Sequence, residues 1–169
     1  MHSSKLDEID RRILIHLQRD ARATLVKLSK IAYLSSPQCY RRIKRLEQNG
    51  IIKRCVALLD REKMGFGVMA SVGLTRDKEH SPATPSFDTL LNRLPEVLEC
   101  YTVTGDFDYL LKVVAKDLKE FNVFLNERLL KIPGVVSIRS AICLEEIKYS
   151  TVLPIDLQTR RAQKGDGGK

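Results

Sequence analysis

One short stretch of the chain combines cationic, amide and hydroxyl side chains. It begins at a Ser-Ser-Pro sequence, and its polar members are Ser35, Ser36, Gln38, Arg41, Arg42, Lys44 and Arg45. If the stretch is helical, a turn of about 100° per residue gathers the glutamine and the three arginines on one side. Guanidinium groups bond guanine edges or phosphates with two hydrogen bonds, and glutamine pairs with adenine. This side therefore has the chemistry to read the major groove of double-stranded DNA, with Lys44 beside it as a phosphate contact.

A plainer interpretation is that the arginines only solvate an exposed helix face, as most runs of charge do. Three observations favour DNA. The run falls on the third helix of a three-helix pattern, acidic residues hardly oppose it, and it begins at the Ser35-Ser36 cap. The free N–H groups at such a cap can bind a phosphate.

A second candidate site is the loop Gly105-Asp106-Phe107-Asp108, which lies between two predicted strands. Glycine lets backbone N–H groups face a carboxylate, while Asp106 or Asp108 can accept hydrogen bonds from an amino group. A free amino acid carries both a carboxylate and an amino group, so it could bind to both features of the loop. The alternative is that Gly-Asp only makes a hairpin turn, because both residue types favour turns without any ligand.

The net charge of +8 is concentrated in the first part of the chain. Residues 1–65 hold 15 Lys and Arg against 7 Asp and Glu, whereas residues 66–169 hold 14 of each. A compact basic domain beside a neutral one attracts polyanions, and it favours nucleic acid over a membrane surface.

The scattered cysteines and histidines indicate neither an enzyme nor a metal or cofactor site. Four cysteines and three histidines lie far apart, without a CxxC pair or a zinc-type spacing. The start of the chain has no apolar stretch typical of a signal peptide, and no apolar run is long enough to span a bilayer. We therefore expect a cytoplasmic protein with reduced thiols and no membrane partner.

The N-terminal part has the pattern of a helix-turn-helix. Leu6, Ile9, Ile13 and Leu17 recur at helical spacing. Thr24 can cap a second helix with Leu25, Leu28 and Ile31 or Ala32 inward, and the third helix runs from the Ser-Ser-Pro cap to Asn49-Gly50. The next ten residues, 51–60, are apolar and β-branched enough to predict a strand.

The remaining chain alternates strands and helices. We expect strands at 67–75, 97–104, 109–115 and 136–145 and helices at 87–94 and 118–131, in the order βαββαβ. The expected fold class is α+β. The chain is predicted to comprise a helix-turn-helix domain (1–60), a hinge (61–66), a ferredoxin-like domain (67–156) and a disordered tail (157–169). Apolar residues such as Val68, Val113 and Ile142 predict that the open sheet face is buried against a second copy or another element.

Several motifs in order resemble the Lrp/AsnC family of leucine- and asparagine-responsive regulators. They are LDEIDRRILIHLQRDAR, SSPQCYRRIKRLEQNGII, VALLDREKMGFG, VLECYTVTGDFDYLLKV and IPGVVSIRSAICLEEIK. The resemblance takes in nearly everything from Leu6 to Pro154. The chain departs from the family pattern at Ser137 and Ala141 and in the proline-containing stretch 79–86.

The resemblance implies a winged-helix-like DNA-binding domain and dimers formed through the sheet domain, assembling into tetramers or octamers. It also implies a small effector, usually an amino acid, bound at clefts between dimers. It makes Gly105, Asp106 and Asp108 expected effector contacts, with the segment from Ser137 to Ser140 as a second wall. The expected function is a sequence-specific transcription regulator that responds to an amino acid and binds a palindromic site.

Three other functions would each use part of this sequence. An architectural protein that compacts DNA without sequence preference would use the same arginine face. Recognition of RNA by the sheet fits poorly, because the stretch 64–72 has Met64 where the RNA-binding motif needs a basic residue and Val68 where it needs an aromatic one. An enzyme would need a set of catalytic residues at a suitable spacing. The only close acid pair on a loop of interest is Asp106 and Asp108, and it fits a turn or an amine-binding site better than catalysis.

Overall fold

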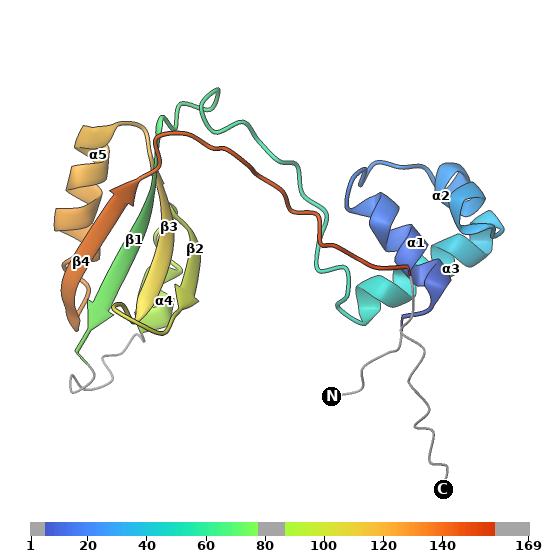
Figure 1. The fold of residues 1–169 in the computed structure, drawn as a ribbon, viewed down its shortest axis with the longest axis horizontal. Coiled ribbons are helices and arrows are strands. Elements are labelled where there is room, and N and C mark those ends of the chain that lie inside the picture. Colours follow the sequence, from blue (N-terminus) through green and yellow to red (C-terminus); the bar gives the residue numbers. More distant parts are fainter. Residues whose placement is uncertain (1–5, 78–86, 158–169) are drawn as a thin grey trace, which may run out of the picture. The chain divides into compact units, whose positions relative to one another are not determined.

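The computed structural model describes residues 6–77 and 87–157, which form two compact units (Figure 1). The helical unit consists of residues 6–57 and of 148–157, a stretch called here the returning segment. The sheet unit consists of the described residues between 58 and 147. The expected second domain, 67–156, therefore gives up its last residues to the helical unit. The stretch 79–86 and the expected disordered tail beyond residue 157 lie outside the described residues.

The helical unit contains the three expected helices: α1 (Glu8–Leu17), α2 (Leu25–Ala32) and α3 (Ser36–Gln48). Each begins at a polar cap. The Asp7 carboxylate accepts from the Asp10 N–H at 2.7 Å, and the Thr24 hydroxyl accepts from the Lys27 N–H at 3.2 Å. Ser35 is the cap of α3, as predicted. The three helices surround a small apolar core built on Ile13, Leu28, Ala32, Cys39 and Leu46.

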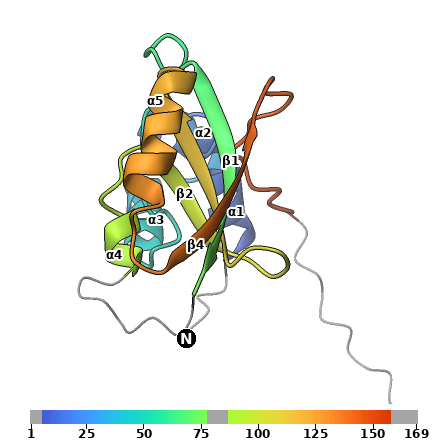
Figure 2. The same ribbon diagram turned by 90° about the vertical axis from the view of Figure 1, so that its left-hand side faces the viewer.

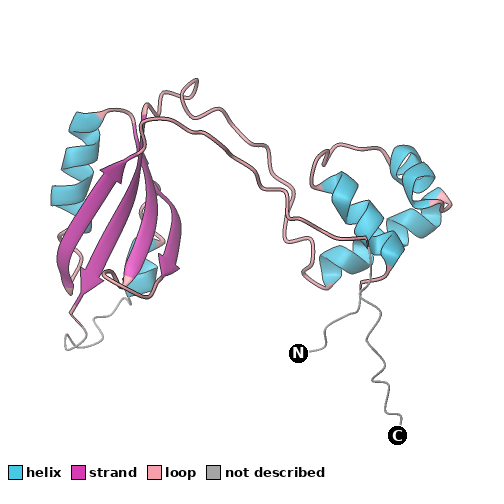
Figure 3. Ribbon diagram, viewed as in Figure 1, coloured by secondary structure: helices cyan, strands magenta, loops and turns pink. Residues whose placement is uncertain are grey.

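Two expectations for this unit were wrong. Leu25 is exposed rather than inward, because it stands at the first position of α2, before the helix reaches the core. Residues 51–60 form no strand (Figure 3). Their backbone groups find no neighbouring strand among the described residues of this chain, and a strand needs a partner for its hydrogen bonds.

The turn between α2 and α3 carries an unusual residue. Tyr33 has φ 54° and ψ 46°, the left-handed conformation that glycine adopts most easily. Its side chain is 82% exposed, and the Arg12 guanidinium lies over its ring, 5.5 Å from the centroid. The turn is therefore made at the cost of some backbone strain.

The sheet unit confirms the ferredoxin-like order βαββαβ. Its elements are β1 (Val68–Arg76), α4 (Phe87–Leu91), β2 (Val97–Thr102), β3 (Tyr109–Ala115), α5 (Leu118–Val123), the π-helical turn η1 (Phe124–Leu129) and β4 (Val135–Ile142). The strands are antiparallel in the order β2-β3-β1-β4. Figures 1 and 2 show α5 lying along one face of the sheet.

Alternate residues of the central strands face the helices. Val72, Leu74, Leu111 and Val113 are buried in one core with the aromatic and aliphatic side chains of α4, α5 and η1. Val68 and Val113 thus belong to the helix-covered face, and Ile142 lies on the same face because it pairs with Ala70 of that core. The expected place of all three on the open face was wrong.

The opposite sheet face carries the intervening residues of each strand. Register pairs Tyr101 with Leu110 and Ser71 with Lys112 there, and Tyr101 and Leu110 are exposed. This open face therefore combines apolar and polar side chains. In the described part of the chain, no helix is long and apolar enough to cross a membrane.

Candidate DNA-binding face and ligand loop

The polar residues of the Ser-Ser-Pro stretch do not share one environment in the structure. Gln38 turns back to the cap: its side-chain oxygen accepts from the Ser35 N–H at 3.2 Å and from the Ser35 hydroxyl at 3.1 Å. Ser36 is half-buried, and its hydroxyl lies 3.4 Å from that of Ser29. These contacts define the start of α3, while Ser35 itself stays exposed.

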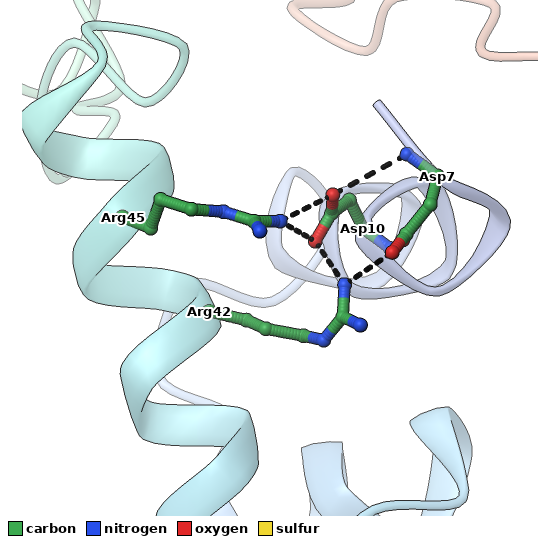
Figure 4. A network of polar contacts seen from close by, with 4 residues as sticks. All are labelled: Asp7, Asp10, Arg42 and Arg45. Atoms are coloured by element: carbon green, nitrogen blue, oxygen red, sulfur yellow. Dashed lines mark hydrogen bonds and ion pairs between the residues drawn. The ribbon is translucent and has the colours of Figure 1, made fainter. Parts of the chain in front are cut away.

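Two of the predicted DNA-reading arginines instead bind a buried carboxylate on α1 (Figure 4). Asp10 is 1% exposed, and its Oδ1 accepts from the Arg42 guanidinium at 2.8 Å. Arg45 donates to both oxygens of Asp10, at 2.8 and 2.6 Å. Arg42 also bonds Asp7 at 2.6 Å. We call Asp7, Asp10, Arg42 and Arg45 the carboxylate–guanidinium network.

The ion pair between Asp7 and Arg42 shifts the pKa values of both groups. Burial alone would raise the pKa of Asp7, but hydrogen bonds from the Asp10 N–H and from Arg42 outweigh it, so the pKa of Asp7 lies below its ordinary value. The hydrogen bond to Asp7 raises the pKa of Arg42. Both groups are therefore charged at neutral pH, and the network attaches the middle of α3 to the first turn of α1.

Three exposed residues of α3 lie outside the carboxylate–guanidinium network. Tyr40, Arg41 and Lys44 are exposed and share one side of the helix, and we call them the outer face of α3. The Arg41 side chain makes no hydrogen bond or ion pair with any other described residue. Lys44 bonds Glu47 at 2.8 Å and lies 5.8 Å from the centre of the Tyr40 ring.

Sequence reasoning missed Tyr40, which is 49% exposed, because the prediction rested on the charged and amide side chains of the stretch. Its position directly before Arg41 and one helical turn before Lys44, one residue after the buried Cys39, was an available signal. Sequence reasoning also missed the role of Asp7 and Asp10. Their spacing of three residues marks a reciprocal helix cap, but the sequence does not show that α3 packs against it.

The candidate ligand loop is a tight turn between β2 and β3. Gly105 has φ +114°, a conformation that requires glycine, and Gly105 and Asp106 are exposed. Asp108 is half-buried and structural in part: its Oδ2 accepts from the Arg76 N–H at 2.8 Å, and its own N–H donates to the Leu74 carbonyl at 3.0 Å. Asp108 thereby ties the turn to the end of β1, whereas Asp106 is the exposed carboxylate of the loop.

A close contact fixes the position of the loop aromatic. A Cβ atom added at Gly73 would lie 2.6 Å from Cγ of Phe107, so the ring rests directly on the β1 backbone. Ser137 pairs with Thr75 at this end of the sheet, whereas Ser140 pairs with Val72 on the helix-covered face. The two serines thus lie on opposite faces of β4, and only Ser137 stands beside the loop end of β1.

Comparison with known protein families matches both units. Residues 6–53 match the winged helix-turn-helix DNA-binding model, and residues 69–153 match the Lrp/AsnC ligand binding domain. The first match covers all three helices of the helical unit. The second covers the sheet and extends into the returning segment.

The chain is also similar to named regulators over most of its length. It is 38% identical over 151 residues to the DNA-binding transcriptional activator DecR of Escherichia coli, covering 89% of this chain and 99% of that protein. It is 39% identical over 150 residues to the leucine-responsive regulatory protein of the same species, covering 89% and 92%. A transcriptional regulator from Neisseria meningitidis, solved as a complex with L-Met, is 38% identical with a TM-score of 0.84, covering 89% and 97%.

Proposed function

The chain belongs to the Lrp/AsnC family of sequence-specific DNA-binding transcription regulators, and from this premise we propose which residues read DNA and which kind of ligand it senses. The relatives are transcription regulators and not enzymes. The proposal divides the charged residues of α3 into a group that contacts DNA and a group that holds the helix in place.

The outer face of α3 reads the major groove. Arg41 supplies a guanidinium with no competing partner among the described residues, and Tyr40 supplies an exposed ring that can contact a thymine methyl group. Lys44 and the exposed cap at Ser35 are suited to phosphates. The observation that carries this assignment is that Arg42 and Arg45 are already engaged by Asp10.

Quantitative DNA binding tests the division. If Arg41 contacts a base, Arg41→Ala costs about 1 to 3 kcal/mol on the preferred duplex and little on random DNA. Lys44→Ala weakens both duplexes alike and lowers the slope of log Kd against log salt by about one. Equal, sequence-blind losses for both variants would show that Arg41 contacts phosphate only.

The ligand of the sheet unit is an amino acid bound near the loop 105–108. Support comes from the exposed Asp106 carboxylate, the free backbone at Gly105 and the neighbouring Ser137. A carboxylate can bind an ammonium group, and exposed N–H groups can bind a carboxylate. The similar proteins include a leucine-responsive regulator and a complex with L-Met. Asp108 is committed to the end of β1 and acts by shaping the loop.

Calorimetric titration of the full chain with each of the twenty amino acids tests the ligand class. We expect one or a few to bind, and Asp106→Ala to weaken that binding at least tenfold. Glu146→Ala serves as the control, since it removes an exposed carboxylate from the same unit. An affinity that Asp106→Ala leaves unchanged would remove this residue from the ligand site.

The functional form is a homodimer that assembles further to a tetramer or octamer. The open sheet face, with Tyr101 and Leu110 exposed, is the surface suited to self-association. A two-fold dimer would present two copies of α3 and favour a palindromic DNA site. The protein acts on chromosomal DNA in the cytoplasm. Sedimentation with and without the amino acid tests the assembly, and a strict monomer would contradict it.

A further inference from the structure

The returning segment is attached to α1 by its backbone. Gln18, at the C-terminal end of α1, donates from its amide nitrogen to the Leu153 carbonyl at 2.9 Å. The same side chain accepts from the Leu153 N–H, also at 2.9 Å. Arg11, two turns earlier on α1, donates to the Asp156 carbonyl at 3.0 Å. Between these points Ile155 packs against the apolar core of the helical unit.

The Gln18 side chain therefore makes the pair of backbone hydrogen bonds that a neighbouring β-strand would make. It satisfies both the donor and the acceptor of one residue in a segment that forms no helix or strand of its own. The Leu153 side chain is exposed, so α1 recognises the backbone there rather than the side chain. Gln18 itself is held in position, because its N–H donates to the Leu14 carbonyl at 3.0 Å.

Helix α1 binds the returning segment and the DNA-reading helix through adjacent residues. Arg11 contacts the returning segment, and Asp10, the residue before it, binds Arg42 and Arg45 of α3. Hydrogen bonds thus attach residues 153–156 to α1, and a second set attaches α1 to the middle of α3. Such a packed, hydrogen-bonded set can carry a positional constraint from one element to the next.

We propose that the returning segment contributes to DNA binding by the helical unit, because it constrains α1 and through it α3. Gln18 is then a positioning residue for DNA binding. The matching family model assigns residues up to 153 to the ligand-binding domain, whereas their contacts lie on α1. Only residues 143–147 separate the end of β4 from this segment. The chain therefore has a second covalent connection between the units, and it ends on the helix that holds α3.

The test is DNA binding by full-length Gln18→Met, which keeps the length of the side chain and removes both hydrogen bonds to Leu153. The probe is the duplex that the wild-type protein selects from a random library. We expect Kd to rise about three- to tenfold, the effect of losing one or two net hydrogen bonds, at a temperature where circular dichroism shows both proteins fully folded. The salt dependence stays that of the wild type, because no phosphate contact is lost.

Two controls isolate the effect. Gln163→Met makes the same substitution outside the described residues and should leave Kd unchanged. Loss of stability alone would shift the thermal midpoint of Gln18→Met without changing Kd at a temperature where the protein is folded. A Kd equal to that of the wild type would therefore overturn the proposal.

A pair of truncations provides a second, independent measurement. Ending the chain after Leu157 keeps the returning segment, whereas ending it after Tyr149 removes the residues that contact Gln18 and Arg11. We expect the shorter chain to bind about tenfold or more weakly than the longer one, at the same salt slope. If the shorter chain does not fold, Gln18→Met decides alone. Equal binding by two folded truncations would contradict the proposal.

Discussion

The buried carboxylate of Asp10 makes the clearest prediction about how the helical unit is held together. Asp10→Asn keeps the shape of the side chain but places an amide, with its own donors, against two guanidinium groups. Arg42 would keep Asp7 as a partner, and Arg45 would keep none of the ion pairs seen here. The substitution therefore removes the buried charge that α1 offers to both arginines of α3.

The magnitude follows from burial. Removing one partner of a fully buried pair costs about 3 to 5 kcal/mol. Here the Asp10 side chain is 1% exposed, but those of Arg42 and Arg45 are 24% and 52% exposed, so water can partly replace the lost partner. We therefore expect Asp10→Asn to lower the free energy of unfolding of the helical unit by about 2 to 3 kcal/mol.

Urea unfolding followed by far-UV circular dichroism measures this loss. Glu8→Gln is the matched control, because it removes a carboxylate from the same first turn, in an exposed pair with Arg12. Both substitutions lose a similar interaction with the helix dipole. The control should cost less than about 1 kcal/mol. If Asp10→Asn lowers the free energy of unfolding no more than the control does, the network does not hold α3 in place. The assignment of Arg42 and Arg45 to the network and of Arg41 to DNA would then be wrong.

Three further predictions concern the turn at Tyr33, the loop that carries Phe107 and the stability of the protein in acid. Tyr33→Gly should raise the thermal midpoint, with a gain of about 0.5 to 1 kcal/mol, because it relieves a left-handed backbone; a fall would show that the Tyr33 ring contributes more than the strain costs. Gly73→Ala should destabilise the sheet unit by about 1 to 3 kcal/mol in urea, since its Cβ would lie 2.6 Å from Phe107; an unchanged midpoint would show that the ring moves freely. Asp7 has a lowered pKa, so its contribution is present above its unfolded pKa and is lost as pH falls through the lower folded value. The thermal midpoint should thus fall more steeply below about pH 4 in the wild type than in Asp7→Asn, and parallel curves would contradict this.

Local signals in the sequence predicted most elements of the fold. The caps at Thr24 and Ser35 and the apolar spacing of Ile13 located the helices, because these signals act within one or two turns. The order of strands and helices predicted the ferredoxin-like sheet. The expected strand at 51–60 failed because β propensity describes a residue that already has a neighbouring strand.

Long-range contacts account for what the sequence did not predict. A helical projection places Arg42 and Arg45 beside Arg41, but it does not show that α1 brings Asp10 against two of the three. Strand alternation likewise groups Val113 with its neighbours without telling which sheet face the helices cover. The attachment of Leu153 to Gln18 joins residues 135 positions apart, and no local pattern marks it.

Selection of preferred sites from a random DNA library, with the wild type, Arg41→Ala and Arg45→Ala, tests the central claim most directly. The assignment of the outer face of α3 to DNA, and of Arg42 and Arg45 to the carboxylate–guanidinium network, predicts that Arg41→Ala loses preference at one base position in each half-site. It predicts that Arg45→Ala selects the same sequence as the wild type, with lower affinity. A changed preference in Arg45→Ala together with an unchanged one in Arg41→Ala would show that Arg45 leaves Asp10 to read DNA, and would contradict the assignment.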